Sequence, residues 1–337
     1  MISSNRQKDV VVITGASAGL GRAIASRFAV SGARLGITAR GRQRLELAKS
    51  ELEALGAEVL TFSEDVADAD AMERVAERVE RELGPIDIWI NNATVSVFSP
   101  VKQMEPADYR RVTEVTYLGF VYGTLAALRR MLPRNRGVII QIGSALAYRG
   151  IPLQSAYCAG KHAIMGFHES LLSELIHDRS AVRTTMVQMP ALNTPQFNWS
   201  KTRLPKLLQP LGPVFQPEVG AEAVFFAAYH DVGRELLVGW PTVKVVEGNK
   251  IVAGYIDRKL AREAFSGQQS SEPVSPDYKD NLWQPAPGIW GAHGRFDRVA
   301  RWKSTQLRLQ LRLNLLAEAL QRFFGSRSRA SGGPAER

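Results

Sequence analysis

The sequence predicts an α/β fold: a doubly wound parallel sheet with helices on both faces, followed by an irregular and helical C-terminal extension. Short apolar runs alternate with longer segments of helical spacing between residues 10 and 238. Strands separated by single helices pair in parallel through right-handed crossovers. The 337 residues, 45% of them hydrophobic, suffice for one large core with some chain left over.

Each predicted element corresponds to one such run. Strands are expected at 10–14, 34–38, 57–62, 86–91, 137–143, 182–189 and 235–238. Helices are expected between them, at 20–31, 41–55, 68–83, 106–132, 154–177 and 217–229. In such a sheet the ligand crevice lies at the carboxyl ends of the strands.

A glycine-rich turn follows the first predicted strand and leads into a helix. A strand, a glycine-rich turn and a helix N-terminus together receive a dinucleotide pyrophosphate on backbone N–H groups. An ordinary βα turn can be equally rich in glycine, so the motif needs support from elsewhere in the chain. The turn consists of Thr14, Gly15, Ala16, Ser17, Ala18, Gly19, Leu20 and Gly21.

Tyr157 and Lys161 are spaced to share one face of a helix, with Ser144 upstream. An ammonium beside a phenol favours the phenolate, so we expect Lys161 to lower the pKa of Tyr157. Tyr157 would then serve as a proton donor and acceptor. Alone, such a pair is common on helix surfaces.

Taken together, the motifs resemble those of the short-chain dehydrogenase/reductase family. The resemblance covers about residues 8–265 and implies a Rossmann fold and NAD(P)-dependent oxidoreduction. The matching residues, in order, are Thr14, Gly15, Gly19 and Gly21, then Asn91, Asn92 and Ala93, then Ser144, Tyr157 and Lys161, then Pro190 and Thr194.

The resemblance also implies roles for these residues. Tyr157 would exchange the proton, Ser144 would position the substrate oxygen, and Lys161 would hold the cofactor ribose. The implied cofactor-binding residues are Gly15, Ser17, Ala18, Gly19, Leu20, Gly21, Asp65, Val66, Asn92, Ala93, Tyr157, Lys161, Pro190 and Thr194.

Two residues depart from the family pattern. Thr94 stands where the family usually has glycine, and Thr116 stands where it often has an asparagine that anchors a proton-relay water. A threonine hydroxyl has a shorter reach than an asparagine amide. Thr116 is the candidate catalytic residue at this position, and its shorter reach argues against a full proton relay.

The end of the second predicted strand bears on the choice of cofactor. An acidic residue there would bind the ribose 2′-hydroxyl and select NAD, but the strand is followed by Arg40, Gly41 and Arg42. Arg40 can pair with a 2′-phosphate, so we expect NADP(H) to be preferred over NAD(H). The alternative is that Arg40 and Arg42 only form a solvated helix start.

Residues 191–216 are rich in proline and carry Phe197, Trp199 and Phe215. They resemble the family's substrate lid. Their apolar character suggests a bulky hydrophobic carbonyl or alcohol substrate. The alternative, given equal weight, is that these aromatic residues serve only to pack the lid onto the core.

We divide the chain into a catalytic domain, 1–265, and an extension, 266–337. Residues 295–337 hold ten Lys and Arg against three Asp and Glu, a net charge of +7 out of +10 for the chain. Residues 304–324 read as a basic amphipathic helix, suited to an anionic membrane surface, a partner subunit or the protein's own core. Residues 326–337 are expected to be disordered.

Several classes are excluded or disfavoured. The single Cys158 allows no internal disulfide, and the five histidines lack metal-ligand spacing. No N-terminal segment reads as a signal peptide, so a cytoplasmic location is expected, with a membrane-peripheral location as the alternative. Only the net charge favours nucleic-acid binding, and no nucleic-acid-binding motif is present. The helices at 106–132 and 154–177 are expected to form a homo-oligomer.

These observations predict an NADP(H)-dependent oxidoreductase that interconverts a hydrophobic ketone or aldehyde and its alcohol. A protein that senses the dinucleotide without turnover is the competing class. It would not need the complete set of Ser144, Tyr157 and Lys161. A peripheral membrane reductase, anchored by the basic C-terminal segment, is the third reading.

Overall fold

The computed structural model describes residues 8–330, with side-chain surroundings up to residue 320. Its central sheet has seven strands in the order β10-β7-β6-β4-β1-β2-β3, and all neighbouring pairs are parallel. The predicted doubly wound fold is thereby confirmed. The strands are β1 Val10–Thr14, β2 Arg34–Ala39, β3 Glu58–Ser63, β4 Ile88–Asn91, β6 Val138–Ser144, β7 Arg183–Met189 and β10 Glu235–Leu237.

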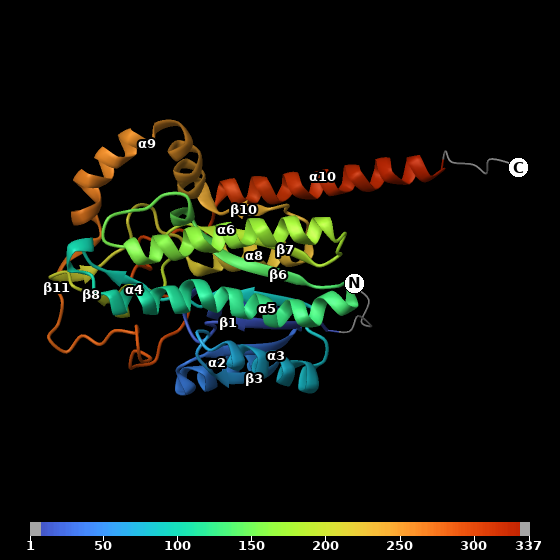
Figure 1. Cartoon of the computed structure of the whole chain (residues 1–337), viewed down its shortest axis with the longest axis horizontal. Coiled ribbons are helices and arrows are strands. Elements are labelled where there is room, and N and C mark those ends of the chain that lie inside the picture. Colours follow the sequence, from blue (N-terminus) through green and yellow to red (C-terminus); the bar gives the residue numbers. More distant parts are fainter. Residues whose placement is uncertain (1–7, 331–337) are drawn as a thin grey trace, which may run out of the picture.

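Helices cover both faces of this sheet (Figure 1). The expected segment 106–132 is α4 and α5 joined by a π-helical turn at Glu114–Leu118. The helices are α1 Gly19–Val30, α2 Arg42–Ala54, α3 Ala69–Leu83, α4 Pro106–Thr113, α5 Gly119–Met131, α6 Ser155–His177 and α8 Pro217–Tyr229.

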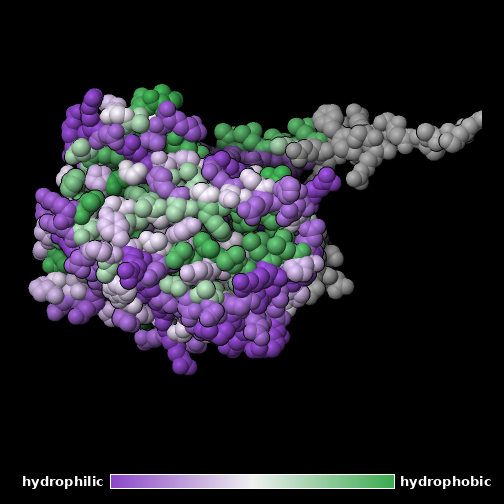
Figure 2. Space-filling model, in the orientation of Figure 1, coloured by the Kyte–Doolittle hydropathy of each residue, from purple (hydrophilic) through white to green (hydrophobic). Residues whose placement is uncertain are grey.

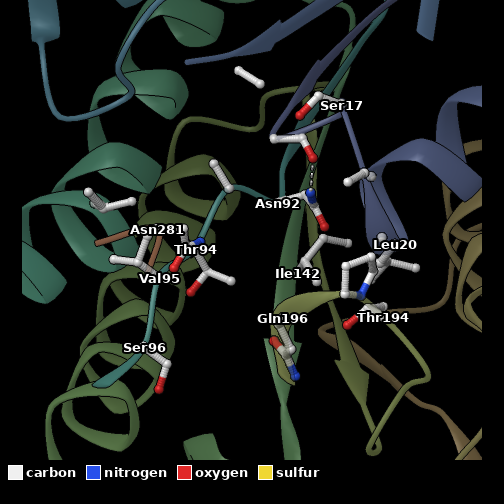
Figure 3. A pocket seen from close by; sticks show the side chains of 18 of the residues that line it. Ser17, Leu20, Asn92, Thr94, Val95, Ser96, Ile142, Thr194, Gln196 and Asn281 are labelled. Carbon is white, nitrogen blue, oxygen red and sulfur yellow. Dashed lines mark hydrogen bonds between the residues drawn. The ribbon is translucent and has the colours of Figure 1, made fainter. Parts of the chain in front are cut away.

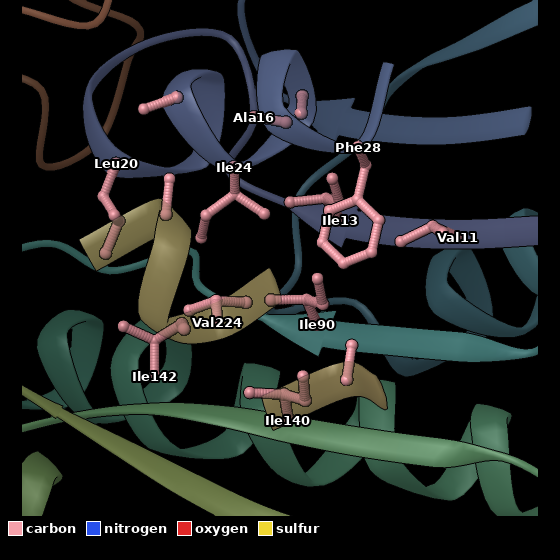
Figure 4. Packing of buried hydrophobic residues seen from close by; sticks show 14 of the residues in the cluster. Val11, Ile13, Ala16, Leu20, Ile24, Phe28, Ile90, Ile140, Ile142 and Val224 are labelled. Atoms are coloured by element: carbon pink, nitrogen blue, oxygen red, sulfur yellow. The ribbon is translucent and has the colours of Figure 1, made fainter. Parts of the chain in front are cut away.

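Two apolar clusters lie on opposite faces of the sheet. Figure 4 shows one of them, in which Phe28 and Ile24 of α1 and Val224 of α8 pack on Ile13 and Ile90 of the strands. The other cluster contains the fully buried Trp89 of β4 and the apolar face of α3. Burial on both faces explains why the inner strands β1 and β4 read as short apolar runs, whereas the edge strand β3 is partly exposed.

The sequence patterns did not predict α9, Gly239–Gly267, which bends at Val252 and arches away from the sheet (Figure 1). Most of its apolar side chains face solvent, so they follow no buried periodicity. Ile251 is 81% exposed and Tyr255 is 65% exposed. The other unpredicted elements are α7 Gln196–Trp199 and the short strands β5 Val97–Phe98, β8 Lys201–Thr202, β9 Lys206–Leu208 and β11 Gln269–Pro273.

The last helix, α10 Thr305–Ala330, projects away from the body of the protein (Figure 1). Its start docks on the core, since Leu307 is buried and Gln306 accepts from the Gly239 N–H at 2.6 Å. Beyond that turn its leucines are exposed, and Figure 2 shows apolar atoms along α10 and at the top of α9. The exposed leucines are Leu309, Leu313, Leu315, Leu316 and Leu320.

Helix α10 includes residues 326–330 of the stretch that was expected to be disordered, and residues 331–337 lie outside the described part. Within the described residues, no helix combines the length and apolar character needed to cross a bilayer.

Candidate active site

A cleft of about 220 Å³ lies at the carboxyl ends of the strands, where the ligand crevice was expected. The glycine-rich turn lines one side, the residues after β4 line another, and the segment after β7 lines a third (Figure 3). Every predicted cofactor-binding residue lines the cleft. These are Gly15, Ser17, Ala18, Gly19, Leu20, Gly21, Arg40, Asp65, Val66, Asn92, Ala93, Tyr157, Lys161, Pro190 and Thr194.

Asn92 fixes the glycine-rich turn to the end of β4. Its side-chain amide donates to the carbonyls of Thr14, at 2.9 Å, and Gly15, at 3.2 Å. Gly15 has a positive φ of 69°, and a Cβ there would lie 2.8 Å from the Cα of Ala93. The turn and the end of β4 can approach this closely only because residue 15 is glycine.

Ser144, Tyr157 and Lys161 line one cleft, although they come from two elements. Ser144 ends β6, and Tyr157 and Lys161 lie one turn apart on α6. The Lys161 ammonium is buried and donates to the Ile142 carbonyl at 2.7 Å. Its Nζ is 5.6 Å from the centre of the Tyr157 ring.

The expected lowering of the Tyr157 pKa is not found. Burial raises the pKa of the phenol, and the Ser144 side chain offsets this only in part. Burial also lowers the pKa of Lys161 to about 7. The ammonium donates to a backbone carbonyl and lies over the face of the phenol ring. Burial is the largest influence on the phenol pKa.

Thr116 is held away from the cleft by three partners. Its hydroxyl donates to the Val95 carbonyl at 3.0 Å, accepts from the Val95 N–H at 3.2 Å, and lies 3.0 Å from the Thr94 hydroxyl. One donor and two acceptor positions are all that a hydroxyl has. A relay water on Thr116 would have to displace one of these partners, and the catalytic role of Thr116 stays a prediction.

Asp65, at the end of β3, is paired with Arg111 of α4. Its other oxygen accepts from the Ala67 N–H at 3.0 Å, which fixes the turn that follows the strand. The neighbouring Val66 is buried and also lines the cleft. These residues wall the end of the cleft beside Arg40.

Arg40 and Arg44 bring two guanidinium groups to the end of β2. Arg40 donates to the carbonyls of 281–283, with Nη1 at 3.1 Å from Leu282 O and 3.0 Å from Trp283 O. Burial lowers the pKa of Arg40; Asp65 opposes this shift, and the nearby Arg111 and Arg44 add to it.

Arg44 was not predicted as a site residue, yet it is buried and lines the cleft. Its Nη1 donates to the Ala286 carbonyl at 2.6 Å, while its Nε is a buried donor without an acceptor. A buried orphan donor is unfavourable unless a ligand or water satisfies it. An anionic group at the end of β2 fits this requirement.

The extension contributes to the cleft, which the division at residue 265 did not anticipate. Asn281 and Pro285 line it, together with Gln196 and Trp199 of α7. Ser96, another unpredicted lining residue, is buried with no partner for its hydroxyl. No sequence motif predicts these lining residues, because they come from loops that are far apart in the sequence. Among the described residues, no group of acidic, His and Cys side chains could hold a metal ion.

Comparison with known proteins agrees with this geometry. A sequence model described as short chain dehydrogenase matches residues 9–203. An uncharacterised oxidoreductase of Bacillus subtilis is 30% identical over 284 residues, 83% of this chain and 79% of the relative. The fatty acyl-CoA reductase of Acinetobacter baylyi is 30% identical over 229 residues, 67% of this chain and 75% of the relative.

Solved structures give the same answer. An alcohol dehydrogenase from the archaeon Thermococcus sibiricus, complexed with 5-hydroxy-NADP, is 27% identical with a TM-score of 0.59, and covers 68% of this chain and 96% of its own. A metagenomic short-chain oxidoreductase in complex with NADP is 28% identical with a TM-score of 0.58 and the same coverage.

The fold and the assembled Ser144, Tyr157 and Lys161 define an NAD(P)-dependent oxidoreductase. The chain belongs to the short-chain dehydrogenase/reductase family.

Proposed function

We propose that the protein is an NADP(H)-dependent oxidoreductase that interconverts a hydrophobic ketone or aldehyde and its alcohol. The observation that carries the cofactor preference is the buried Arg44 Nε, which lacks an acceptor beside Arg40 at the end of β2. A 2′-phosphate supplies acceptor oxygens at such a position, and NAD(H) has none there. No acidic side chain stands at the end of β2 to bind a ribose hydroxyl instead.

Three side chains carry the proposed chemistry, while the bound dinucleotide supplies or takes the hydride at the carbonyl carbon. In reduction, the Tyr157 phenol gives its proton to the substrate oxygen, and the raised pKa keeps this proton in place until then. Ser144 donates a hydrogen bond to the same oxygen. Lys161 lies one turn along α6, where it can reach the cofactor ribose.

Apolar residues of the lid and the cleft support the proposal of a hydrophobic substrate. Phe197 of α7 is buried against Phe98 and Phe296, with ring centres 6.3 and 5.7 Å apart. Part of the lid's apolar character is therefore used in packing. Leu192, Met189 and Val95 still line the cleft, beside Ser96, whose buried hydroxyl has no partner. We infer a largely apolar substrate with a polar group near the reacting carbonyl.

A turnover screen tests this proposal. Purified protein is mixed with NADPH or NADH and a panel of long-chain aldehydes, cyclic ketones and short polar carbonyls, and absorbance of the reduced nicotinamide is followed. We expect turnover with the apolar carbonyls and faster turnover with NADPH. Dinucleotide binding without turnover of any carbonyl or of the matching alcohols would favour the sensing protein.

A peripheral membrane location is the second candidate, favoured by the exposed leucines of α10 and the exposed apex of α9. Arg308 and Arg312 lie among the α10 leucines, which suits an anionic lipid surface. We expect co-sedimentation with vesicles containing anionic lipid and less with neutral vesicles. Replacing Leu309, Leu313, Leu316 and Leu320 by Gln should abolish it. Equal binding by this variant would contradict the proposal.

We also propose a homo-oligomer formed through α5 and α6. Leu125 is 41% exposed and Ile176 is 68% exposed, so each helix presents apolar surface to solvent. Light scattering at micromolar concentration tests this, and a monomer would refute it. Comparing wild type with the α10 leucine variant separates an α5–α6 interface from association through α10.

A further inference from the structure

Residues 281–297, which we call the strap, cross the dinucleotide cleft from one end to the other. The end beside β2 is fixed: Leu282 and Ala286 are buried, and the carbonyls of 281–283 and 286 accept hydrogen bonds from guanidinium groups. The donors are Arg40, Arg44 and Arg111.

The other end of the strap is fixed to the segment after β7. The Gly294 N–H donates to the Asn193 carbonyl at 3.1 Å, and the Phe296 N–H donates to the Asn193 side chain at 2.9 Å. Asn193 in turn donates to Asp297 at 2.8 Å. Trp290 stacks edge-to-face on Trp199 of the lid, with ring centres 5.5 Å apart. The strap thus joins the adenosine end of the cleft to the lid.

Between these anchors the strap is exposed and lies over the start of α1. Residues 287–289 and 291 face solvent, and Gly288 has a positive φ of 95°. The Gly291 carbonyl accepts from the Gly19 N–H at 3.0 Å. Gly19 is the first residue of α1, where a dinucleotide pyrophosphate binds in this fold. The middle of the strap therefore occupies a donor that the cofactor would use.

We propose that the strap is a cofactor-binding element. Its anchored ends hold Arg40 and Arg44 in place and form the outer wall of the cleft, and its middle, 287–291, opens to admit the dinucleotide and closes over it. This inference rests on the dinucleotide-binding part of the proposed function and does not depend on the substrate. The cleft of about 220 Å³ agrees with it, because pockets for drug-sized ligands start at about 300 Å³.

Gly294 of the strap and Gly254 of α9 provide a matched pair of variants. A Cβ at Gly294 would lie 2.5 Å from the Thr194 carbonyl oxygen, so Gly294→Ala must push the strap off the segment after β7. A Cβ at Gly254, on the exposed part of α9, meets nothing within 4 Å, so Gly254→Ala adds the same methyl group away from the cleft. The affinities of full-length wild type and both variants for NADPH and NADH are measured by energy transfer from tryptophan to the reduced nicotinamide.

We expect Gly294→Ala to weaken binding of both dinucleotides about tenfold or more, and Gly254→Ala to bind like wild type. Hydrogen exchange of wild type provides a second readout: amides of 287–292 should exchange more slowly when a dinucleotide is bound. Unchanged affinity in Gly294→Ala together with unchanged exchange would overturn the proposal. Equal wild-type affinity for NADPH and NADH would instead contradict only the proposed NADP(H) preference.

Discussion

The hydroxyl groups of Thr94 and Thr116 lie 3.0 Å apart and connect the loop after β4 to the π-helical turn before α5. These are the two residues that depart from the family pattern. Thr116 also bonds both backbone groups of Val95, so one buried hydroxyl fixes the loop that lines the substrate side of the cleft. The two departures are therefore a coupled pair with a structural role.

Thr116→Val should destabilise the protein without abolishing chemistry. Valine keeps the shape but leaves the buried Val95 N–H without its partner, which costs roughly 1–3 kcal/mol. Denaturant unfolding measures this loss, and turnover per folded molecule should stay near wild type. Thr113→Val, on the exposed face of α4, is the control. A large loss of turnover at unchanged stability would support the relay hypothesis instead.

Tyr157→Phe should remove turnover and leave cofactor affinity nearly intact. The phenol is the proton donor of the proposed reaction, and losing a general acid costs on the order of 100-fold or more in rate. Steady-state kinetics and NADPH titration measure the two quantities separately. Substantial residual turnover would mean that another group delivers the proton.

Arg40→Ala should weaken NADPH more than NADH. Arg40 also holds the strap, so its loss should weaken both cofactors to some extent. The ratio of the two affinities therefore isolates the contact with the 2′-phosphate. Losing a charge-assisted contact to phosphate costs about 1.5–3 kcal/mol. Arg44→Ala should act in the same direction, while the exposed Arg42→Ala should leave the ratio unchanged. Equal losses for both cofactors would rule out the 2′-phosphate contact.

The buried His168 should make the free energy of unfolding fall in acid. Burial lowers its pKa from 6.5 to about 4, so between these values the unfolded chain binds more protons than the folded chain. The free energy of unfolding then rises with pH across this window and falls on acidification, by roughly 3 kcal/mol from pH 7 to about pH 4. Denaturant unfolding should show a shallower pH slope between pH 4 and 7 for His168→Gln than for wild type, and an equal slope would contradict the prediction.

Much of the fold and site could be predicted because the signals are local. The inner strands β1 and β4 are buried on both faces, so each reads as a short apolar run, and Tyr157 and Lys161 lie on one helix. The spacing of these residues does not determine their proton affinities. The pKa of Tyr157 depends on how deeply the folded chain buries the phenol, and no pattern in the sequence encodes that depth.

Contacts of high sequence separation were missed for a different reason. Arg44 meets the Ala286 carbonyl across 242 residues, and a backbone acceptor has no signature in the sequence. Helix α9 escaped prediction because most of its apolar residues face outward, so no buried stripe marks it. A sequence pattern cannot predict a side chain that contacts backbone far along the chain, or an apolar side chain that contacts nothing within the chain.

The position of the strap late in the chain also sets an order of assembly during synthesis. All seven strands of the central sheet end by Leu237, more than forty residues before Asn281. Because N-terminal segments emerge from the ribosome first, the sheet can form while its nucleotide cleft is still uncovered. A nascent chain therefore has an open cleft that a free dinucleotide can enter before the segment that later covers it has been translated.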